Sequence, residues 1–282
     1  MAISRTSVYS GMGPKDLIGK SYARFWNPNM AAVSAEVTEA LAERFQAVER
    51  ALELAKAADL QAAIDKGRHF ETGYARLASG IYYVAVSTPM PEVTGKMLKW
   101  WFGWHGEETQ RYKLWHPRDH LSVKTYAKND TAQSSDPFTR YLGIVSHVKE
   151  YIGKELQSLA ISFAPPTAYG LSESGMAAAR IDAAICARIG YSSVPLAFGD
   201  LIHLLQRSQS GEMVMRSRFW LGDVTIGPVI AGRGKRFAIG GNIARRFIIG
   251  EPQLRALLLH CAEEMQHLAS FLPALYEEHG QG

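Results

Sequence analysis

The strongest constraint on the fold of this chain is a helical pattern near its end, over residues 251–278. Pro252 suits the first turn of a helix, and Gly280 follows the last turn. Between them, leucine, methionine and phenylalanine recur at helical spacing and give the predicted helix a broad apolar stripe. We therefore expect this helix to pack along its length against another layer of the structure.

Two polar residues of this helix, His260 and Glu264, are candidates for chemistry. They lie four residues apart, so their side chains project from the same helix face. On a buried face, an imidazole and a carboxylate at this spacing can bind one metal ion. On an exposed face, the same pair is an ordinary polar contact. The spacing alone leaves both interpretations open.

The composition narrows the class of protein. With 47% hydrophobic and 21% charged residues among 282, the chain has the composition of a soluble globular protein. It contains neither an apolar run approaching the roughly eighteen residues of a membrane span nor an apparent signal peptide, so we expect a cytoplasmic protein without a membrane partner. Cys186 and Cys261 are too few for a disulfide framework, and we expect both to be buried free thiols.

The charge balance argues against a nucleic-acid partner. The net charge of +4 comes from 31 basic and 27 acidic residues, with only short basic clusters at residues 233–236 and 245–246. Nucleic-acid binding usually requires a more extensive basic surface. We interpret the two clusters as solvated loops.

The N-terminal part of the chain predicts an arm followed by helix. Residues 1–33 are rich in Ser, Gly, Pro and Asn, which is typical of an extended arm of the kind that often embraces a second subunit. Residues 34–57 carry apolar side chains at helical spacing and predict a long helix. Residues 82–86 then predict a strand or extended connection. We place a boundary there, separating an N-terminal arm and helical region, 1–88, from a domain at 89–282.

The larger region predicts an antiparallel sheet. Strand-like patterns separated by turn residues cover 144–151, 156–163, 183–191, 200–206 and 213–224. A run of strands followed by one long amphipathic helix indicates an α+β fold, with the sheet curled around the helix and a cavity between them. His147 and Glu150 fall on opposite faces of the first of these strands if it is regular.

An aromatic stretch, WWFGWHGEETQRYKLWHPRDH, runs from Trp100 to His120 in a segment whose helix we expect to open at Pro91. It holds four of the six tryptophans of the chain and also His105 and His116. One interpretation is an aromatic core segment with an exposed polar edge. The other is the wall of a pocket for a flat aromatic ligand.

Four phrases of the sequence carry a resemblance to a known family. They are the Trp100–His120 stretch, HVKEYIG at 147–153, MRSRFWLGD at 215–223 and HCAEEMQHLASFLP at 260–273. In this order they resemble the acylphloroglucinol carbon–carbon hydrolases, the family of diacetylphloroglucinol hydrolase and phloretin hydrolase. The resemblance spans residues 91–276, and four phrases in register make it specific.

The resemblance implies a fold and a cofactor. The fold is a helix-grip domain like that of the Bet v 1 allergens, preceded by a small helical N-terminal region, in a homodimer. The cofactor is a zinc ion held by two histidines and two glutamates. Carried over residue by residue, the metal ligands are His120, Glu150, His260 and Glu264.

The resemblance also implies a reaction, which is hydrolysis of the bond between a polyhydroxylated aromatic ring and an acyl carbonyl. Protonation of the ring at carbon turns the substrate into a 1,3-dicarbonyl compound, whose cleavage is a retro-Claisen step. The catalytic candidates are His203 for proton transfer at the ring and Tyr112 for a hydrogen bond to a ring hydroxyl. Val123 departs from the family, because diacetylphloroglucinol hydrolase has an amide side chain there, so we predict the substrate only as a small acyl-phenol.

Two other function classes remain open from the sequence. The first is a non-catalytic helix-grip binder of aromatic ligands, because a fold alone does not imply an activity. The second is another metal-dependent enzyme acting on aryl compounds, such as an aryl esterase or an iron oxygenase. Metal content separates the first from an enzyme, and product analysis separates the second.

Overall fold

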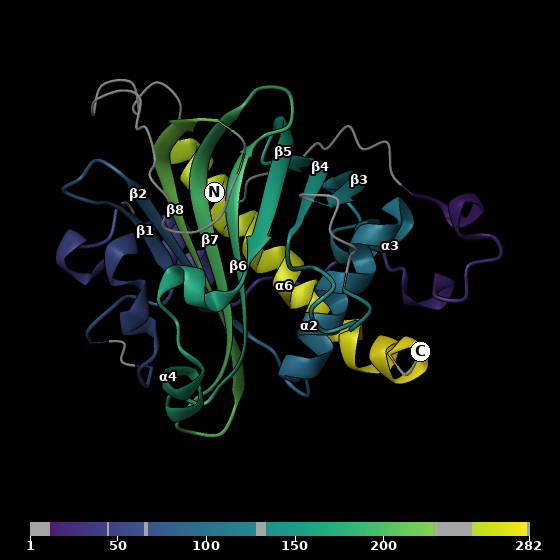
Figure 1. The fold of residues 1–282 in the computed structure, drawn as a ribbon, viewed down its shortest axis with the longest axis horizontal. Coiled ribbons are helices and arrows are strands. Elements are labelled where there is room, and N and C mark those ends of the chain that lie inside the picture. Colours follow the sequence, from purple (N-terminus) through teal and green to yellow (C-terminus); the bar gives the residue numbers. More distant parts are fainter. Residues whose placement is uncertain are drawn as a thin grey trace.

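A computed structural model describes residues 12–43, 45–64, 67–127, 134–227, 229 and 250–280. Its centre is one antiparallel sheet of eight strands in the order β1-β2-β8-β7-β6-β5-β4-β3 (Figure 1). The strands are β1 (Gly73–Arg76), β2 (Tyr82–Pro89), β3 (His120–Ala127), β4 (Ile144–Ile152), β5 (Glu155–Ala164), β6 (Ile181–Tyr191), β7 (Leu196–Arg207) and β8 (Met213–Ile226). The α-helices are α1 (Ala35–Ala42), α2 (Gly95–Trp104), α3 (Thr109–Trp115), α4 (Glu173–Ala178) and α6 (Glu251–His279).

The long helix α6 crosses the sheet diagonally in Figure 1 and packs against β2, β4, α2 and α3. Its apolar stripe is fully buried, with Leu254, Leu258 and Met265 each 0% exposed. The curved sheet therefore grips the helix, and the α+β helix-grip prediction is confirmed. The five strands predicted between residues 144 and 224 correspond to β4–β8, and the predicted strand at 82–86 lies within β2.

Strand β4 shows how the alternation of side chains builds the interior. Glu150 lines the cavity between sheet and helix. His147 lies on the other face, where its ring contacts Tyr126 at a centroid distance of 5.1 Å. The prediction that these two residues of β4 face opposite sides is therefore confirmed.

A second apolar cluster covers part of the other face of the sheet. It joins Leu52 and Leu60 of the N-terminal region to Trp220 of β8. Next to it, the buried carboxylate of Glu71 forms ion pairs with the guanidinium groups of Arg216 (2.8 Å) and Arg218. The N-terminal region is thus bound to the sheet by both apolar packing and buried charge.

Two predictions about helices are wrong. The predicted helix at 34–57 ends at Ala42, and 3-10 turns follow at Val48–Arg50 and Leu54–Leu60. The cause is a tertiary contact, since the backbone N–H of Gln46 donates to the carbonyl of Tyr74 in β1 at 2.8 Å, and this pairing overrides the local helical pattern.

The helix expected to open at Pro91 begins later, at Gly95. The side chain of Thr94 supplies the cap, because its hydroxyl accepts a hydrogen bond from the backbone N–H of Met97 at 3.3 Å. The helix therefore starts where a side chain satisfies its first free N–H groups, and Pro91 lies in the preceding turn.

The N-terminal region and the sheet share strands. Both β1 and β2 precede the boundary near residue 88 or end at it, and both belong to the eight-stranded sheet. The described part of the arm packs on the same chain, where the Tyr22 hydroxyl donates to Glu108 at 2.6 Å and the Tyr22 ring meets Trp104 edge-on. The division of the chain into two domains stays a prediction.

Other sequence predictions have mixed outcomes. Cys186 and Cys261 are free and buried, as expected. Among the described residues, no helix is both long enough and apolar enough to cross a membrane. The basic clusters at 233–236 and 245–246 lie outside the described residues.

Candidate metal centre and cavity

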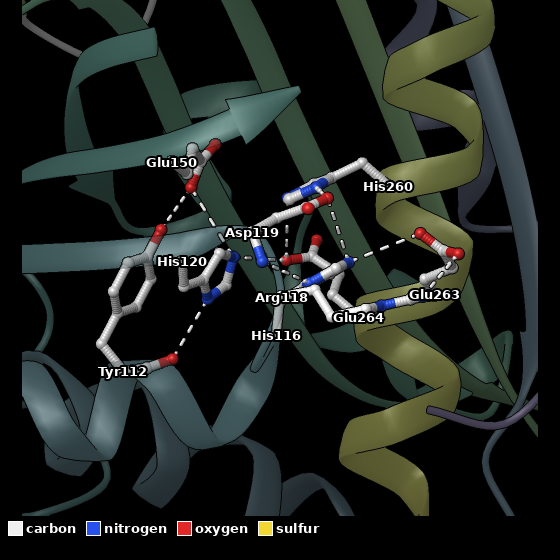
Figure 2. Close-up of polar contacts among 9 residues, drawn as sticks. All are labelled: Tyr112, His116, Arg118, Asp119, His120, Glu150, His260, Glu263 and Glu264. Atoms are coloured by element: carbon white, nitrogen blue, oxygen red, sulfur yellow. Dashed lines mark hydrogen bonds and ion pairs between the residues drawn. The ribbon is translucent and has the colours of Figure 1, made fainter. Parts of the chain in front are cut away.

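Three elements bring the four predicted metal ligands together at one end of the cavity. His120 opens β3, and Glu150, near the end of β4, is its partner in the sheet register. His260 and Glu264 project from α6 (Figure 2). All four are buried, between 1% and 8% exposed.

The ligand atoms of His120, His260 and Glu264 all lie within 4.8 Å of one another, which suits shared ligands of one ion, and Glu150 approaches this group at His120. Nε2 of His120 lies 3.7 Å from a carboxylate oxygen of Glu150 and 3.6 Å from one of Glu264, and Nε2 of His260 lies 3.8 Å from Glu264. These separations are too long for hydrogen bonds. They are close to the roughly 3.4 Å that separates neighbouring ligands of a tetrahedral zinc ion with bonds of about 2.0–2.1 Å.

Hydrogen bonds to the other imidazole nitrogens favour the same interpretation. Nδ1 of His120 donates to the backbone carbonyl of Tyr112 at 3.1 Å, and Nδ1 of His260 donates to Asp119 at 3.1 Å. With the proton on Nδ1, each ring presents the Nε2 lone pair to the carboxylates, an assignment made from the hydrogen-bond network. Nε2 of His120 is buried and has no hydrogen-bond partner among the described residues. Residues His120, His260 and Glu264 can therefore hold a metal ion.

The candidate ligand atoms of a neighbouring group, His116, Asp119 and His260, also lie within 4.8 Å of one another. This group differs from the first in the position of the proton on its histidine His116. The backbone N–H of Asp119 donates to Nδ1 of His116 at 3.1 Å, so the proton of this ring sits on Nε2. Nε2 faces the carboxylates of Asp119 at 3.4 Å and Glu263 at 3.5 Å. His116 therefore points an N–H group, and not a lone pair, at these carboxylates. Its ring stacks on that of the candidate ligand His260 at a centroid distance of 4.7 Å.

Burial and neighbouring charge shift the pKa values of these groups when no metal is bound. Burial raises the pKa of Glu264 to about 8, opposed by the charge of His260 and reinforced by Glu150 and Asp119. Burial alone would lower the pKa of His260, but the hydrogen bond to Asp119 and the nearby carboxylates raise it to about 9. Protons thus offset a concentration of buried negative charge, and a divalent cation can replace them.

Tyr112 of α3 is attached to this cluster directly. Its hydroxyl donates to Glu150, and its ring stacks on His120 at 3.9 Å with an interplanar angle of 3° (Figure 2). Burial and the charge of Glu150 raise the pKa of Tyr112 well above its ordinary value. The phenol therefore stays protonated and can act as a hydrogen-bond donor at the edge of the site.

The cavity extends from the candidate ligands between α6 and the sheet, with a volume of about 200 Å³. Glu150, His260 and Glu264 line it, as do the polar side chains of Ser146, Glu155, Gln157 and Gln253. Its walls are mainly aromatic and aliphatic side chains, including Phe102, Leu159, Phe163, Ile189, Leu201, Phe219 and Leu221. Such a space suits a flat ring that carries polar substituents.

His203 lines the same cavity from β7. Its Nδ1 lies 2.7 Å from the Ser217 hydroxyl, and its ring lies within 6.3 Å of Phe102 and 5.8 Å of Phe219. Burial lowers the pKa of His203 to about 3, so the imidazole is neutral at pH 7. The ordinary pKa on which its sequence-based role rests therefore does not apply, and the free ring is a proton acceptor at neutral pH.

Val123 lies beside the cavity. It is buried and pairs in the sheet with Val148, whose side chain lines the cavity wall.

The sequence of this chain matches a known protein family. Residues 53–277 match the family model described as the DAPG hydrolase PhiG domain. The chain belongs to this family.

Members of the DAPG hydrolase family supply the similar sequences. The chain is 33% identical to a 2,4-diacetylphloroglucinol hydrolase of Pseudomonas sp over 215 residues, which cover 74% of this chain and 72% of the relative. It is 29% identical to a phloretin hydrolase of Eubacterium ramulus over 269 residues, covering 92% and 90%. A crystal structure of Ara h 8.0201 aligns with a TM-score of 0.36 and 8% identity over 69% of this chain and 97% of that chain. Family membership identifies the chain as a hydrolase.

Sequence reasoning missed the residues that support the ligands in this hydrolase. Asp119 and Glu263 stand beside predicted ligands in the sequence, and the partner of each is distant along the chain. Glu263 is held by Arg118 at 2.8 Å, across 145 positions. The adjacency of Asp119 to His120, and of Glu263 to Glu264, was the available signal.

Proposed function

We propose that this protein is a zinc-dependent hydrolase that cleaves the carbon–carbon bond between a polyhydroxylated aromatic ring and an acyl carbonyl. The observation that carries the proposal is the group of two imidazoles and two carboxylates beside an aromatic cavity. The names of the relatives, which are hydrolases of diacetylphloroglucinol and of phloretin, supply the substrate class.

Zinc is the metal that we assign to His120, Glu150, His260 and Glu264. Two neutral imidazoles and two carboxylates neutralise a divalent ion, and nitrogen and oxygen donors of this kind suit zinc. When bound, zinc supplies a Lewis acid and lowers the pKa of water. The residues of the chain hold the acyl end of the substrate at this point and exclude bulk water from the cavity.

His203 is our candidate for moving the proton at the ring. The reaction needs one ring hydroxyl to lose a proton and the ring carbon that bears the acyl group to gain one, which converts the phenol into a 1,3-dicarbonyl compound. With its own proton on Nδ1, donated to Ser217, a neutral His203 has an acceptor at Nε2. It can take the hydroxyl proton and return it to the carbon.

The second half of the reaction is hydrolytic. Water adds to the acyl carbonyl, and the bond to the ring carbon breaks with its electron pair, which leaves as an enolate that becomes the phenol again. The products are the free polyphenol and a carboxylic acid. Tyr112 is our candidate to hydrogen-bond a ring hydroxyl, because its own proton is donated to Glu150 and its oxygen can accept a hydrogen bond at the edge of the ligand group.

The test uses the full-length purified chain. Its metal content is measured, and it is incubated with acetyl-phloroglucinol and with dihydrocinnamoyl-phloroglucinol, followed by identification of the products. We expect about one zinc per chain, phloroglucinol together with the matching carboxylic acid, and loss of activity on chelation.

The alternatives predict different results. A non-catalytic binder would bind these ligands unchanged, without stoichiometric metal. An aryl esterase would cleave aryl esters and leave the ketones intact, and an oxygenase would consume dioxygen. A homodimeric assembly and a cytoplasmic location stay predictions, which size-exclusion chromatography with light scattering and cell fractionation can check.

A further inference from the structure

His105 is a buried histidine of the cavity wall that the four-ligand cluster does not use. It follows α2 and is 4% exposed. Its ring stacks nearly parallel to Trp101 at 5.1 Å and to Tyr112 at 6.0 Å, and the ring of Trp115 meets it edge-on at 5.2 Å. These contacts fix the imidazole in one orientation. Tyr112 also stacks on the candidate metal ligand His120, so one aromatic ring connects His105 to that ligand.

A hydrogen bond fixes the tautomer of His105. Nδ1 lies 2.7 Å from the backbone carbonyl of Trp101, and a carbonyl only accepts, so Nδ1 carries the proton. Burial lowers the pKa of His105 to about 4, partly opposed by this hydrogen bond, so the ring is neutral at pH 7. Nε2 is therefore a fixed hydrogen-bond acceptor.

Among the described residues, the hydrogen bond of the His105 ring is the one at Nδ1, and none is formed at Nε2. Two other polar side chains of the cavity wall have partners of their own, since the Tyr112 hydroxyl donates to Glu150 and Nδ1 of His203 pairs with Ser217. An acceptor in an aromatic cavity is satisfied when the ligand supplies a donor, and it penalises a ligand that lacks one.

We propose that Nε2 of His105 accepts a hydrogen bond from a ring hydroxyl of the substrate, which makes His105 a specificity-determining residue for hydroxylated rings. This inference rests on the proposed function and adds to it the recognition of the ring. It assigns to His105 neither metal binding nor proton transfer.

Two substitutions separate the role of Nε2 from that of Nδ1. The amide nitrogen of an asparagine occupies the place of Nδ1, so His105→Asn keeps a donor for the Trp101 carbonyl and removes the acceptor from the cavity. The longer glutamine side chain reaches the place of Nε2, so His105→Gln keeps an acceptor there and loses the bond to the helix. Melting temperature and metal content are measured for both variants.

The ligands are 2-ethylphloroglucinol and two analogues that each lack one hydroxyl, 4-ethylresorcinol and 2-ethylresorcinol. All three carry an ethyl group in place of the acetyl group, so the enzyme cannot cleave them during the measurement. Dissociation constants are measured by calorimetry on the zinc-loaded wild type and on both variants. In the wild type, we expect removal of the recognised hydroxyl to weaken binding by about tenfold or more. In His105→Asn this preference should fall to within about threefold, whereas His105→Gln should keep most of it.

Unchanged preference for the trihydroxy ligand in His105→Asn would overturn the inference, even if the wild type cleaves acylphloroglucinols. A loss of preference in His105→Gln alone, accompanied by a lower melting temperature, would also overturn it, because His105 would then only brace the end of α2. If the wild type binds hydroxylated rings through His105 but cleaves none of the acylphloroglucinols, the recognition stands and the proposed function fails. A wild type without any hydroxyl preference refutes the inference directly.

Discussion

Nδ1 of His260 lies 3.1 Å from a carboxylate oxygen of Asp119, and this hydrogen bond joins α6 to the segment before β3 across 141 positions of the chain. It turns the other nitrogen of the ring toward Glu264. Carboxylates in this position orient histidine ligands and increase their basicity. The contact therefore makes Asp119 a positioning residue for the proposed zinc site.

We predict that Asp119→Asn weakens zinc binding by about 10- to 100-fold while the fold is kept, because the four ligands remain but His260 loses its charged partner. Zinc affinity is measured by competition with a chromogenic chelator. Asp182→Asn, at an exposed position of β6, is the matched control and should bind zinc like the wild type. Equal zinc affinity in the two variants would remove Asp119 from the site.

Glu264→Ala should remove zinc and activity but leave a folded protein. The face of α6 that packs on the sheet is supplied by Leu258, Met265 and Leu268, each 0% exposed, and does not depend on the carboxylate. Melting temperature is compared between the variant and metal-free wild type, so that the stabilisation by bound metal cancels. Gln266→Ala, on the same helix, serves as the control. Global unfolding of Glu264→Ala would show that the residue is structural.

His203→Ala should keep zinc near wild-type occupancy and lower turnover by roughly a hundredfold or more, the usual contribution of a positioned proton-transfer group. Substrate binding should suffer less than turnover. Zinc content, melting temperature and turnover number are measured on one preparation. Turnover within about threefold of wild type would assign the proton transfer to another group, such as Tyr112.

The buried ion pairs of Glu71, which lie away from the candidate site, determine part of the pH dependence of the free energy of unfolding. Burial alone would raise its pKa, but Arg218 and Arg216 outweigh burial and lower it from 4.5 to about 2. Because the pKa is lower in the folded state, the stabilisation is fully present above pH 4.5 and is lost as the pH falls toward 2. Urea denaturation between pH 7 and pH 3 measures this loss.

Glu71→Gln is the matching variant. Removing the carboxylate leaves two buried guanidinium groups without their counter-charge, which should lower the free energy of unfolding at pH 7 by about 3–5 kcal/mol. The difference between variant and wild type should shrink as the pH falls, because protonation of Glu71 removes the same charge. Glu49→Gln, at an exposed position, should stay within about 0.5 kcal/mol of wild type at every pH.

The sequence predicted the parts of the fold whose pattern is local and strong. Helix α6 was expected at 251–278 and spans Glu251–His279, and β4–β8 appeared as alternating or apolar runs. Strand β3 was missed because it is an edge strand with several part-exposed positions, and β1 because four residues carry too little pattern. The helix predicted at 34–57 is the opposite case. A strong helical pattern does not continue the helix there, because the backbone of Gln46 forms a hydrogen bond with Tyr74 of β1.

The candidate site also contains residues that the sequence predicts and residues that only the structure reveals. The four proposed ligands come from the family resemblance, and three of them, His120, His260 and Glu264, form a group that could hold a metal ion. The residues behind them required the structure, because the pairing of Asp119 with His260 joins side chains far apart in sequence. His105 required it too, since only the bond from its Nδ1 to the Trp101 carbonyl reveals which nitrogen is left for a ligand.

The order of strands in the sheet has a consequence for how the enzyme is made. Strand β2 pairs with β8, so residues 82–89 have no sheet partner on that side until residues 214–221 have left the ribosome. The last two proposed ligands, His260 and Glu264, emerge later still. Because long-range pairings of this kind form slowly, we expect the growing chain to acquire neither its cavity nor the proposed metal site before residues 260–264 have been synthesised.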